Sequence, residues 1–380
     1  MAKIILGISD SFCANFIAGQ PTYFKNLGNE VAVISAPGAE ISLLTKTENC
    51  KLYTVKYTKT VTPFKDIATL RKLINILKLT KPDIVNAGNP KSGLLLMLAA
   101  YIVGTNMRIF TLHGLPSDSK KGMLKSLLTF LEKLTCKLAH KVIIVSPTLK
   151  DHAIKRNIVP IKKVTVLLPA SCNGLNLNSF NKSALLAQEI VLLQKKHQIN
   201  SQHFVIGYAG RINYDKGITI LIDAFLTLCQ TNAHLRLLMV GPYETTNPLP
   251  QKYIDIIYNH PKIIFVGKVN NMPNYYGCMN VLVLPSFREG FGYVLIEAAA
   301  MQIPVIAPNI PGCKDALVPN YNGLIFEKGN TSQLIKNISC YINDPNLQTQ
   351  HGNNGLAWVS KHFNQTKIWE QINNVFTTPL

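Results

Sequence analysis

The stretch VLVLPSFREGFGYVLIEAAA, residues 281–300, contains the signals of a strand, a turn and a helix in direct succession. The apolar run Val281–Pro285 predicts a buried strand, Gly290 and Gly292 predict a tight turn, and the apolar continuation predicts a helix. Two glycines at such a turn let the backbone approach a ligand closely, and the first N–H groups of the helix carry partial positive charge. The stretch therefore predicts a strand–turn–helix unit that can bind a diphosphate.

Two carboxylates belong to this unit. Glu289 lies in the turn, and Glu297 lies about one turn inside the predicted helix. An ionised carboxylate only accepts hydrogen bonds, so both suit the hydroxyls of a sugar or a ribose. Taken alone, the pair equally fits a solvated loop residue and an acid near a helix start, where acids are favoured.

A second strand–turn–helix unit precedes this one in the sequence. The segment Phe204–Ala209 predicts the strand, the loop Gly210–Gly217 reads GRINYDKG, and apolar residues at helical spacing follow. Arg211 offers a planar fork to a phosphate and Lys216 a compact charge, and two such cations can stabilise a leaving diphosphate without a metal. On its own the loop also fits an ordinary basic turn in which Asp215 neutralises Lys216.

Short Val- and Ile-rich runs alternate with segments of helical period along the whole chain of 380 residues. This alternation is typical of parallel sheets covered by helices on both faces, and the length favours two to three domains. A turn-rich, apolar-poor stretch near Leu168–Leu175 separates two series of candidate strands. The first comprises Lys3–Ile8, Val31–Ser35, Leu52–Lys56, Asp83–Ala87, Met107–Leu112, Lys141–Val145 and Lys163–Leu168; the second comprises Phe204–Ala209, Leu235–Val240, Lys262–Val266, Val281–Pro285 and Ile303–Ala307.

The composition predicts a globular protein with an anionic partner. Hydrophobic residues make up 47% and charged residues 16%, and the formal net charge is +19. Residues 1–175 hold 24 Lys and Arg against 9 Asp and Glu, so most of the excess positive charge lies in the first half.

The eight cysteines show no metal-ligand spacing, which favours reduced core thiols in a cytosolic protein. The run GLLLMLAAYIVG, residues 93–104, is too short to span a bilayer and predicts a buried helix.

Together the two loops resemble a known family. The pattern G-R-x-x-x-x-K-G, followed about seventy residues later by P-S-x-x-E-G-F-G-x-x-x-x-E-A, is similar to the donor-binding half of family-4 retaining glycosyltransferases. Asn322-Gly323 and Asn173-Gly174-Leu175-Asn176 continue the resemblance, although Asp315 stands where many members have Glu, and Asn176 where the linker usually has Asp. In the first half, Thr111-Leu112-His113-Gly114-Leu115 resembles members that build bacterial surface polysaccharides (capsule, O-antigen and exopolysaccharide), whereas the turn after the first strand has only one glycine.

The resemblance implies the GT-B fold, an α/β architecture of two Rossmann-like α/β/α domains whose parallel sheets face a central cleft. Residues 1–170 would form the acceptor-binding domain, and residues 171–360 the nucleotide-sugar-binding domain. The last segment, 361–380, would be a helix that crosses back to the first domain.

The resemblance also assigns roles to residues. Arg211 and Lys216 would bind the donor diphosphate and assist catalysis, Glu297 would bind the ribose, and His113 and Glu289 would contact the donor sugar in catalytic positions. His113 follows a strand, at the carboxyl end where open α/β sheets bind ligands. The remaining expected donor-binding residues are Gly267, Lys268, Val269, Gly290, Phe291, Gly292, Tyr293 and Val294.

The expected activity is transfer of a hexosyl or N-acetylhexosaminyl group, with retention, from a UDP-sugar to a polyprenyl-diphosphate-linked glycan. The resemblance implies no metal and no cofactor, since the nucleotide sugar is a substrate. A nucleotide-sugar epimerase of the same fold and a non-catalytic nucleotide-sugar-binding protein remain alternatives. We expect no nucleic-acid partner, because no recognisable nucleic-acid module and no basic stretch interleaved with aromatics occurs.

A basic segment in the first half predicts a membrane contact. Residues 120–141 form a candidate helix with leucines on one face and lysines roughly opposite, and Glu132 is its only acid. We expect the leucines to pack on the N-terminal sheet and the lysines to meet anionic lipid, which places the enzyme in the cytoplasm, at the inner face of the membrane. The expected membrane-facing residues are Lys120, Lys121, Lys125, Lys133 and Lys137.

Overall fold

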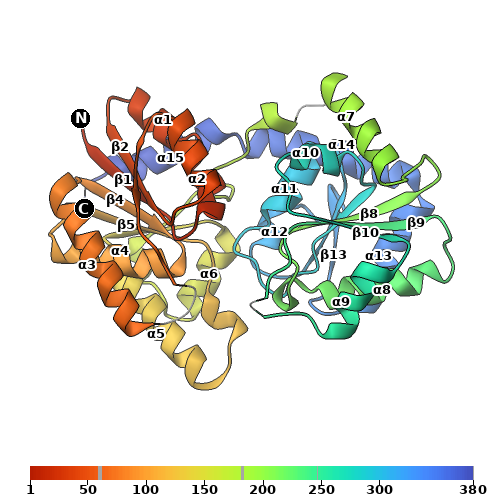
Figure 1. The fold of residues 1–380 in the computed structure, drawn as a ribbon, viewed down its shortest axis with the longest axis horizontal. Helices are drawn as coiled ribbons and strands as arrows, with labels where there is room; N and C mark the ends of the chain where they lie inside the picture. Colours follow the sequence, from red (N-terminus) through yellow and green to blue (C-terminus); the bar gives the residue numbers. More distant parts are fainter. Residues whose placement is uncertain (59–61, 181–183, 246, 380) are drawn as a thin grey trace. The chain divides into compact units, whose positions relative to one another are not determined.

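The computed structural model describes residues 1–58, 62–180, 184–245 and 247–379. The chain divides into two compact units (Figure 1). Unit 1 comprises Met1–Gly174 together with Gln365–Leu380, and unit 2 comprises Leu175–Asn364. The divisions fall slightly later than the expected bounds at residues 170 and 360, and the last helix belongs to the first unit.

Unit 1 is built on a parallel seven-stranded sheet with the strand order β3-β2-β1-β4-β5-β6-β7. Its strands are β1 (Lys3–Gly7), β2 (Glu30–Ser35), β3 (Lys51–Thr54), β4 (Ile84–Gly88), β5 (Met107–Leu112), β6 (Lys141–Ile144) and β7 (Val164–Val166). Its helices are α1 (Gln20–Asn26), α2 (Ala39–Thr47), α3 (Pro63–Thr80), α4 (Pro90–Ile102), α5 (Gly122–Leu138), α6 (Pro147–Lys155) and α15 (Gln365–Thr377), with short 3₁₀ turns η1 (Ser11–Phe16), η2 (Pro116–Ser119) and η3 (Ile161–Lys163).

Unit 2 is built on a parallel six-stranded sheet with the order β10-β9-β8-β11-β12-β13. Its strands are β8 (Phe204–Ala209), β9 (Leu235–Val240), β10 (Ile263–Gly267), β11 (Val281–Val283), β12 (Val305–Pro308) and β13 (Gly323–Phe326). Its helices are α7 (Ala184–Lys196), α8 (Ile218–Cys229), α9 (Gln251–Asn259), α10 (Met272–Tyr276), α11 (Tyr293–Ala300), α12 (Cys313–Ala316), α13 (Thr331–Asn343) and α14 (Pro345–His362), with 3₁₀ turns η4 (Leu177–Phe180) and η5 (Tyr214–Lys216).

The predicted strands are confirmed, and one further strand was missed. Each predicted run overlaps a strand of the structure, and Met107–Leu112, Phe204–Ala209 and Leu235–Val240 have the expected bounds. The missed strand is β13, whose four residues begin at Gly323 beside the backbone of Val305. A side chain at Gly323 would lie 2.4 Å from the carbonyl oxygen of Val305, so this glycine is part of the strand pairing and not of a turn.

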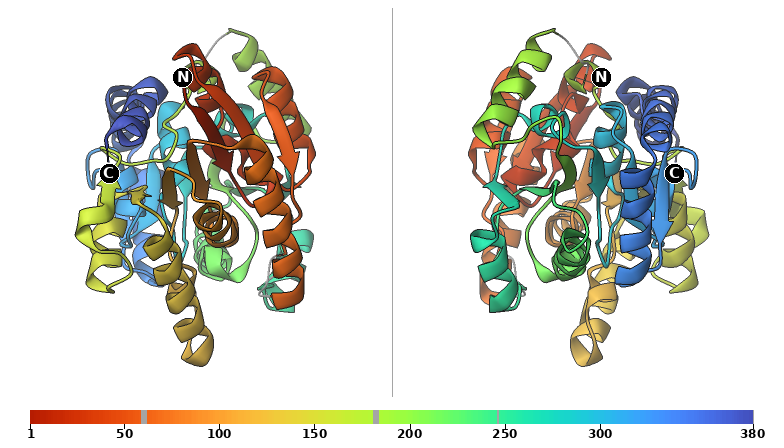
Figure 2. Two further views of the ribbon diagram at one scale, coloured as in Figure 1. Left: turned by 90° about the vertical axis from the view of Figure 1, so that its left-hand side faces the viewer. Right: turned by 90° about the vertical axis from the view of Figure 1, so that its right-hand side faces the viewer.

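The apolar run at residues 93–104 forms most of α4, which lies between α3 and α5 and is largely buried, as predicted. Figures 1 and 2 show α4 packed against the sheet of unit 1. Among the described residues, no helix is long and apolar enough to cross a bilayer.

Three glycines let the loops at the carboxyl edge of the second sheet touch through their backbones. A Cβ on Gly217 would lie 2.0 Å from the carbonyl oxygen of Pro285, and one on Gly241 would lie 1.9 Å from that of Gly210. A Cβ on Gly312 would lie 2.5 Å from the oxygen of Gly290. Because all three also have positive φ, only glycine fits, and the loops after β8, β9, β11 and β12 are held in direct contact.

We expect Gly217→Ala to destabilise unit 2 more than Gly329→Ala. Both glycines have left-handed backbones, with φ of +67° and +82°, but at Gly329 the nearest atom would be 3.9 Å from the new Cβ. The left-handed strain costs about 1–2 kcal/mol at either site, and forced contact with Pro285 adds about 1–3 kcal/mol. Urea unfolding of both variants measures the difference, and equal losses would contradict the close approach.

Candidate active site

The two predicted loops lie side by side where the strand order of unit 2 reverses. The chain runs from β8 outward to β10 on one side and from β11 outward to β13 on the other, so β8 and β11 are neighbours at the centre. Open α/β sheets bind ligands at the carboxyl ends of strands at such a switch point. The backbone N–H of Phe287 donates to the carbonyl of Asp215 at 2.9 Å, which fixes one loop against the other.

Lys216 and Glu289 form an ion pair that joins the two loops. The ammonium group contacts Glu289 Oε1, and the hydroxyl of Ser286 donates to the same oxygen at 2.7 Å. Both charged side chains are mostly buried. Glu289 is therefore not a solvated loop residue, and the cation predicted to bind phosphate is held at the turn that precedes α11.

Arg211 is paired with a residue that the sequence did not single out. Its Nη1 donates to Glu244 Oε2 at 2.7 Å, and the side-chain amide of Asn213 donates to the same oxygen at 2.7 Å. Glu244 follows β9 and thus comes from a third loop at this edge. No spacing rule relates it to Arg211, because the contact exists only once β8 and β9 pair.

The alternative in which Asp215 neutralises Lys216 is wrong. Asp215 accepts a hydrogen bond from the side-chain amide of Asn247 at 2.8 Å and lies 4.0 Å from Arg288. Asn213 caps η5 by accepting from the N–H of Lys216 at 3.1 Å, and the ammonium group of Lys216 contacts Glu289 instead. Lys216 is thus directed to the turn after β11.

Glu297 lies in α11, and its carboxyl accepts a hydrogen bond from a tyrosine hydroxyl. Tyr276, which is fully buried, donates to Glu297 Oε2 at 2.6 Å. Burial raises the pKa of the Glu297 carboxyl from its ordinary value near 4.5 to about 7, although the Tyr276 bond lowers it. This carboxyl can therefore change charge near neutral pH.

The remaining predicted donor-binding residues lie along the same edge. Gly292 is the N-cap of α11, which begins at Tyr293 and continues through Val294, and Phe291 packs on the ring of Phe363 with centroids 5.6 Å apart. Gly290 contacts the loop after β12 through Gly312. Gly267 ends β10, its carbonyl accepts from the N–H of Gly241 at 2.8 Å, and Lys268 and Val269 follow.

His113 lies in unit 1, immediately after β5. Its imidazole stacks on the ring of Phe16 at a centroid distance of 4.8 Å and an angle of 17°. A Cβ on Gly88 would lie 2.6 Å from His113 Nε2, so the ring also rests on the end of β4. Desolvation lowers the pKa of His113 to about 4, and the imidazole is neutral at physiological pH.

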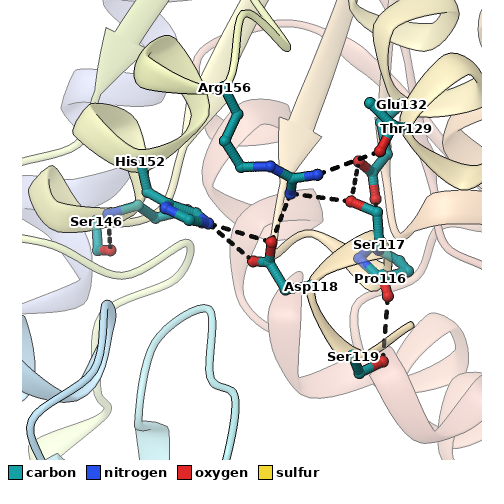
Figure 3. A network of polar contacts seen from close by, with 10 residues as sticks. Pro116, Ser117, Asp118, Ser119, Thr129, Glu132, Ser146, His152 and Arg156 are labelled. Atoms are coloured by element: carbon teal, nitrogen blue, oxygen red, sulfur yellow. Dashed lines mark hydrogen bonds and ion pairs between the residues drawn. The ribbon is translucent and has the colours of Figure 1, made fainter. Parts of the chain in front are cut away.

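A polar network fastens the segment that follows His113 (Figure 3). Glu132 of α5 is buried and accepts from the N–H of Ser117 at 2.9 Å and from its hydroxyl at 2.7 Å. Arg156, which follows α6 directly, donates to Ser117 Oγ at 3.0 Å and to Asp118, which also contacts His152 Nε2 at 3.1 Å. Glu132, the only acid of α5, therefore binds η2 and does not offset the lysines on the surface.

The expected packing of the α5 leucines is wrong for the first half of the helix. The side chains of α5 that are buried are Glu132, Thr135 and Cys136. Met123 is 91% exposed, Phe130 61%, Leu124 47% and Leu127 44%. The N-terminal part of α5 extends past the ends of α3 and α4 in Figures 1 and 2. Lys121, Lys125, Lys133 and Lys137 are exposed and Lys120 is half-buried.

In the described parts of the chain, no three His, Cys, Asp or Glu side chains gather closely enough to hold a metal ion. The eight cysteines are free, and Cys136, Cys172, Cys278 and Cys313 are buried. Burial raises the pKa of the Cys278 thiol to about 11, as expected for a core thiol.

A two-unit α/β protein with basic, glycine-rich loops at the switch point of its second sheet belongs to the class of nucleotide-binding folds used by sugar transferases. Two family models match the chain. Residues 191–358 match glycosyl transferases group 1, and residues 22–170 match Glycosyltransferase Family 4. The chain is also 33% identical over 376 residues, 99% of its length and 97% of the relative's, to the capsular polysaccharide biosynthesis glycosyltransferase CapM of Staphylococcus aureus. This protein therefore belongs to the family-4 glycosyltransferases and is a glycosyltransferase.

A more distant relative and a solved structure agree with this assignment. The UDP-Gal:alpha-D-GlcNAc-diphosphoundecaprenol alpha-1,3-galactosyltransferase of Escherichia coli is 26% identical, covering 84% of this chain and 81% of that protein. The crystal structure of Anabaena Alr3699/HepE in complex with UDP and glucose superimposes with a TM-score of 0.82 at 19% identity, covering 100% of both chains. The predicted GT-B class, with two Rossmann-like units, is confirmed.

We expect Glu297→Gln to stabilise unit 2 relative to the wild type as the pH rises. The folded carboxyl keeps its proton up to about pH 7, whereas the unfolded one loses it near 4.5, so wild-type stability falls across this window. One pKa unit corresponds to about 1.4 kcal/mol. The difference in free energy of unfolding between variant and wild type should therefore grow by about 3 kcal/mol as the pH rises to 7, and stay constant above pH 7. A gap independent of pH would contradict the raised pKa.

Unit 2 can be followed selectively in this experiment. The chain has two tryptophans, of which Trp358 belongs to unit 2 and Trp369 to unit 1. In a Trp369→Phe background, urea unfolding monitored by tryptophan fluorescence reports Trp358 alone. Glu327→Gln, an exposed carboxyl of the same unit, is the matched control and should show no such widening.

Proposed function

We propose that this glycosyltransferase moves a sugar, with retention, from a UDP-sugar to a polyprenyl-diphosphate-linked glycan during synthesis of a bacterial surface polysaccharide. The observation that carries the proposal is the group of charged side chains at the switch point of unit 2. Lys216 contacts Glu289 across the loops after β8 and β11, Arg211 contacts Glu244 from the loop after β9, and Glu297 lies in α11, which follows the loop after β11.

Cleavage of the bond between the sugar and the diphosphate develops negative charge on the leaving oxygen. Lys216 is mostly buried and the side chain of Arg211 about half exposed, and both are positioned by carboxylates before a nucleotide binds. Lysine has three donors and arginine five, so each can bind phosphate oxygens while it keeps its carboxylate partner. Preorganised cations of this kind stabilise a leaving group without a metal, and we propose that the reaction needs none.

Glu297 suits the ribose of the donor. One of its oxygens accepts from Tyr276, which leaves the other available to accept from a ribose hydroxyl. Uridine as the base is supported by the relative that uses UDP-Gal and by the similar structure in complex with UDP and glucose. The similarity to the capsular polysaccharide glycosyltransferase CapM supports a role in polysaccharide assembly, and the Escherichia coli relative, which acts on a diphosphoundecaprenol acceptor, supports a diphosphate-lipid acceptor.

We expect Lys216→Ala and Arg211→Ala each to lower kcat by about a hundredfold or more, because each removes a charge from the leaving diphosphate. Glu297→Ala should abolish transfer through loss of nucleotide binding. The assay first identifies the donor by a thermal-shift screen of nucleotide sugars, then measures transfer to a diphosphate-lipid acceptor and the anomeric configuration of the product by NMR.

The matched control is Lys336→Ala, which removes an exposed lysine from α13 in the same unit. It should transfer at the wild-type rate, and a chelator should leave the wild-type rate unchanged. Full activity of Arg211→Ala or Glu297→Ala would overturn the site. Conversion of the UDP-sugar without an acceptor would identify an epimerase instead, and tight binding with no turnover on any acceptor would identify a binding protein.

We further propose that α5 docks unit 1 on the cytoplasmic face of an anionic membrane. The usual arrangement of an amphipathic helix is reversed here, because Glu132 and Thr135 face the protein while Met123, Leu127 and Phe130 face outward. Exposed apolar side chains flanked by lysines are the features of a helix that lies in a lipid interface. The acceptor proposed above would be presented at the same surface.

We expect Lys125→Gln, Lys133→Gln and Lys137→Gln together to weaken binding to anionic liposomes by on the order of a hundredfold, at about 1 kcal/mol per charge. Co-sedimentation with and without anionic lipid measures the effect. Lys3→Gln, Lys46→Gln and Lys51→Gln form the control, since they remove the same charge from exposed lysines of β1, α2 and β3, outside α5. Equal weakening in both triple variants would show a general charge effect and no docking helix.

A further inference from the structure

A small cavity lies under His113, at the switch point of the first sheet. Its walls include the ends of β1, β4 and β5, where the strand order reverses between β1 and β4, and residues of η1, α1 and α15 complete the lining. Its volume is about 20 Å³. A volume of this size accommodates a water molecule but not a sugar ring, and water occupies such a space when two or more polar groups line it.

The first polar group is the side-chain oxygen of Gln20, which is 2% exposed. The amide nitrogen of Gln20 donates to Phe16 O at 3.2 Å, Cys172 O at 3.3 Å and Asn173 Oδ1 at 3.0 Å. These three acceptors fix the amide orientation, because the opposite one would place oxygen against oxygen. Gln20 Oε1 has no hydrogen-bond partner in the described chain. An unsatisfied buried acceptor costs about 1–3 kcal/mol.

The second group is the side-chain amide of Asn86 on β4. The hydroxyl of Thr111 donates to Asn86 Oδ1 at 2.8 Å, so the oxygen is satisfied and the NH₂ group remains a donor. Both side chains are buried and line the cavity. Gln20 and Asn86 both line the cavity, and they hold an unpartnered acceptor and an available donor, which together match the two hydrogen-bonding roles of a water molecule.

The third group is the imidazole of His113, which also lines the cavity. Its ring is held between Phe16 and Gly88 by packing alone, with no hydrogen bond from the described residues. A neutral imidazole has one donor and one acceptor nitrogen, and the partner of one nitrogen decides which of them carries the proton. A bound water would therefore set the tautomer of His113.

We propose that this cavity binds one water molecule, which donates to Gln20 Oε1, accepts from the amide of Asn86 and hydrogen-bonds the imidazole of His113. Gln20 and Asn86 are then positioning residues, which hold His113 in one tautomer and one ring orientation without contacting a substrate. The water site follows from unit 1 alone, whereas its effect on transfer rests on the proposed function.

A crystal structure of the full-length protein tests the water directly. We expect density for a water within hydrogen-bond distance of Gln20 Oε1 and Asn86 Nδ2. An empty cavity, in a map that shows other buried waters, or Gln20 Oε1 bonded to a protein donor, would overturn the proposal. A water with no detectable transfer for any donor would refute the proposed function and leave the water site standing.

The double variant Asn86→Leu/Thr111→Val tests the positioning role. It replaces both partners of a hydrogen bond by apolar side chains of similar shape, a change that can leave the free energy of unfolding nearly unaltered. We expect the water to be lost, the ¹⁵N shifts of the His113 ring to change, and kcat to fall by about tenfold or more with little change in the donor KM. Thermal unfolding checks that the variant folds.

Ser92→Ala, which removes a buried hydroxyl of α4 bonded to Gly88 O and absent from the cavity walls, is the matched control. It should keep both the water and the ring shifts. Loss of the water with unchanged shifts and unchanged kcat in the double variant would overturn the positioning role.

Discussion

The direct contact of loop backbones at the carboxyl edge of the second sheet is the constraint on which the candidate site depends. Gly217 and Gly241 have no Cβ where the carbonyl oxygens of Pro285 and Gly210 lie. Parallel strands bring their ends to one edge, but loops with side chains at these points would stand apart. The close approach is what carries Lys216 from the loop after β8 to Glu289 in the loop after β11.

This contact has an electrostatic consequence. Two cations at one sheet edge would repel each other and the partial positive charge at the start of α11, and each is compensated by a carboxylate from a neighbouring loop. Because Glu244 and Glu289 are themselves held by Asn213 and Ser286, the charges are fixed before any ligand binds. Glu297 differs, since no cation pairs with it in the described chain, and burial raises the pKa of its carboxyl although the hydrogen bond from Tyr276 lowers it.

The sequence predicted what depends on local pattern and missed what depends on tertiary contact. Val- and Ile-rich runs located the strands, and the two glycine-containing loops located the site. Glu244 and Tyr276 were not predicted, because each reaches its partner across paired strands or packed helices and has no fixed spacing to it. The short strand β13 was missed, and it begins at Gly323, where the absence of a side chain allows a close approach to β12.

Helix α5 shows why periodicity alone cannot assign a buried face. The period separates leucines from lysines, but which side meets the protein depends on what lies beneath, and here Glu132 is buried by its bonds to Ser117. The hydrogen bonds from Ser117 compensate the burial of the carboxyl, and an apolar medium over the outer face, as proposed, would stabilise the exposed apolar side chains further. Because Ser117 follows His113 closely, the bonds that fix this helix orientation also fix the segment that carries the imidazole. The bonds between Glu132 and Ser117 thus position both α5, the proposed membrane helix, and His113, the predicted catalytic histidine.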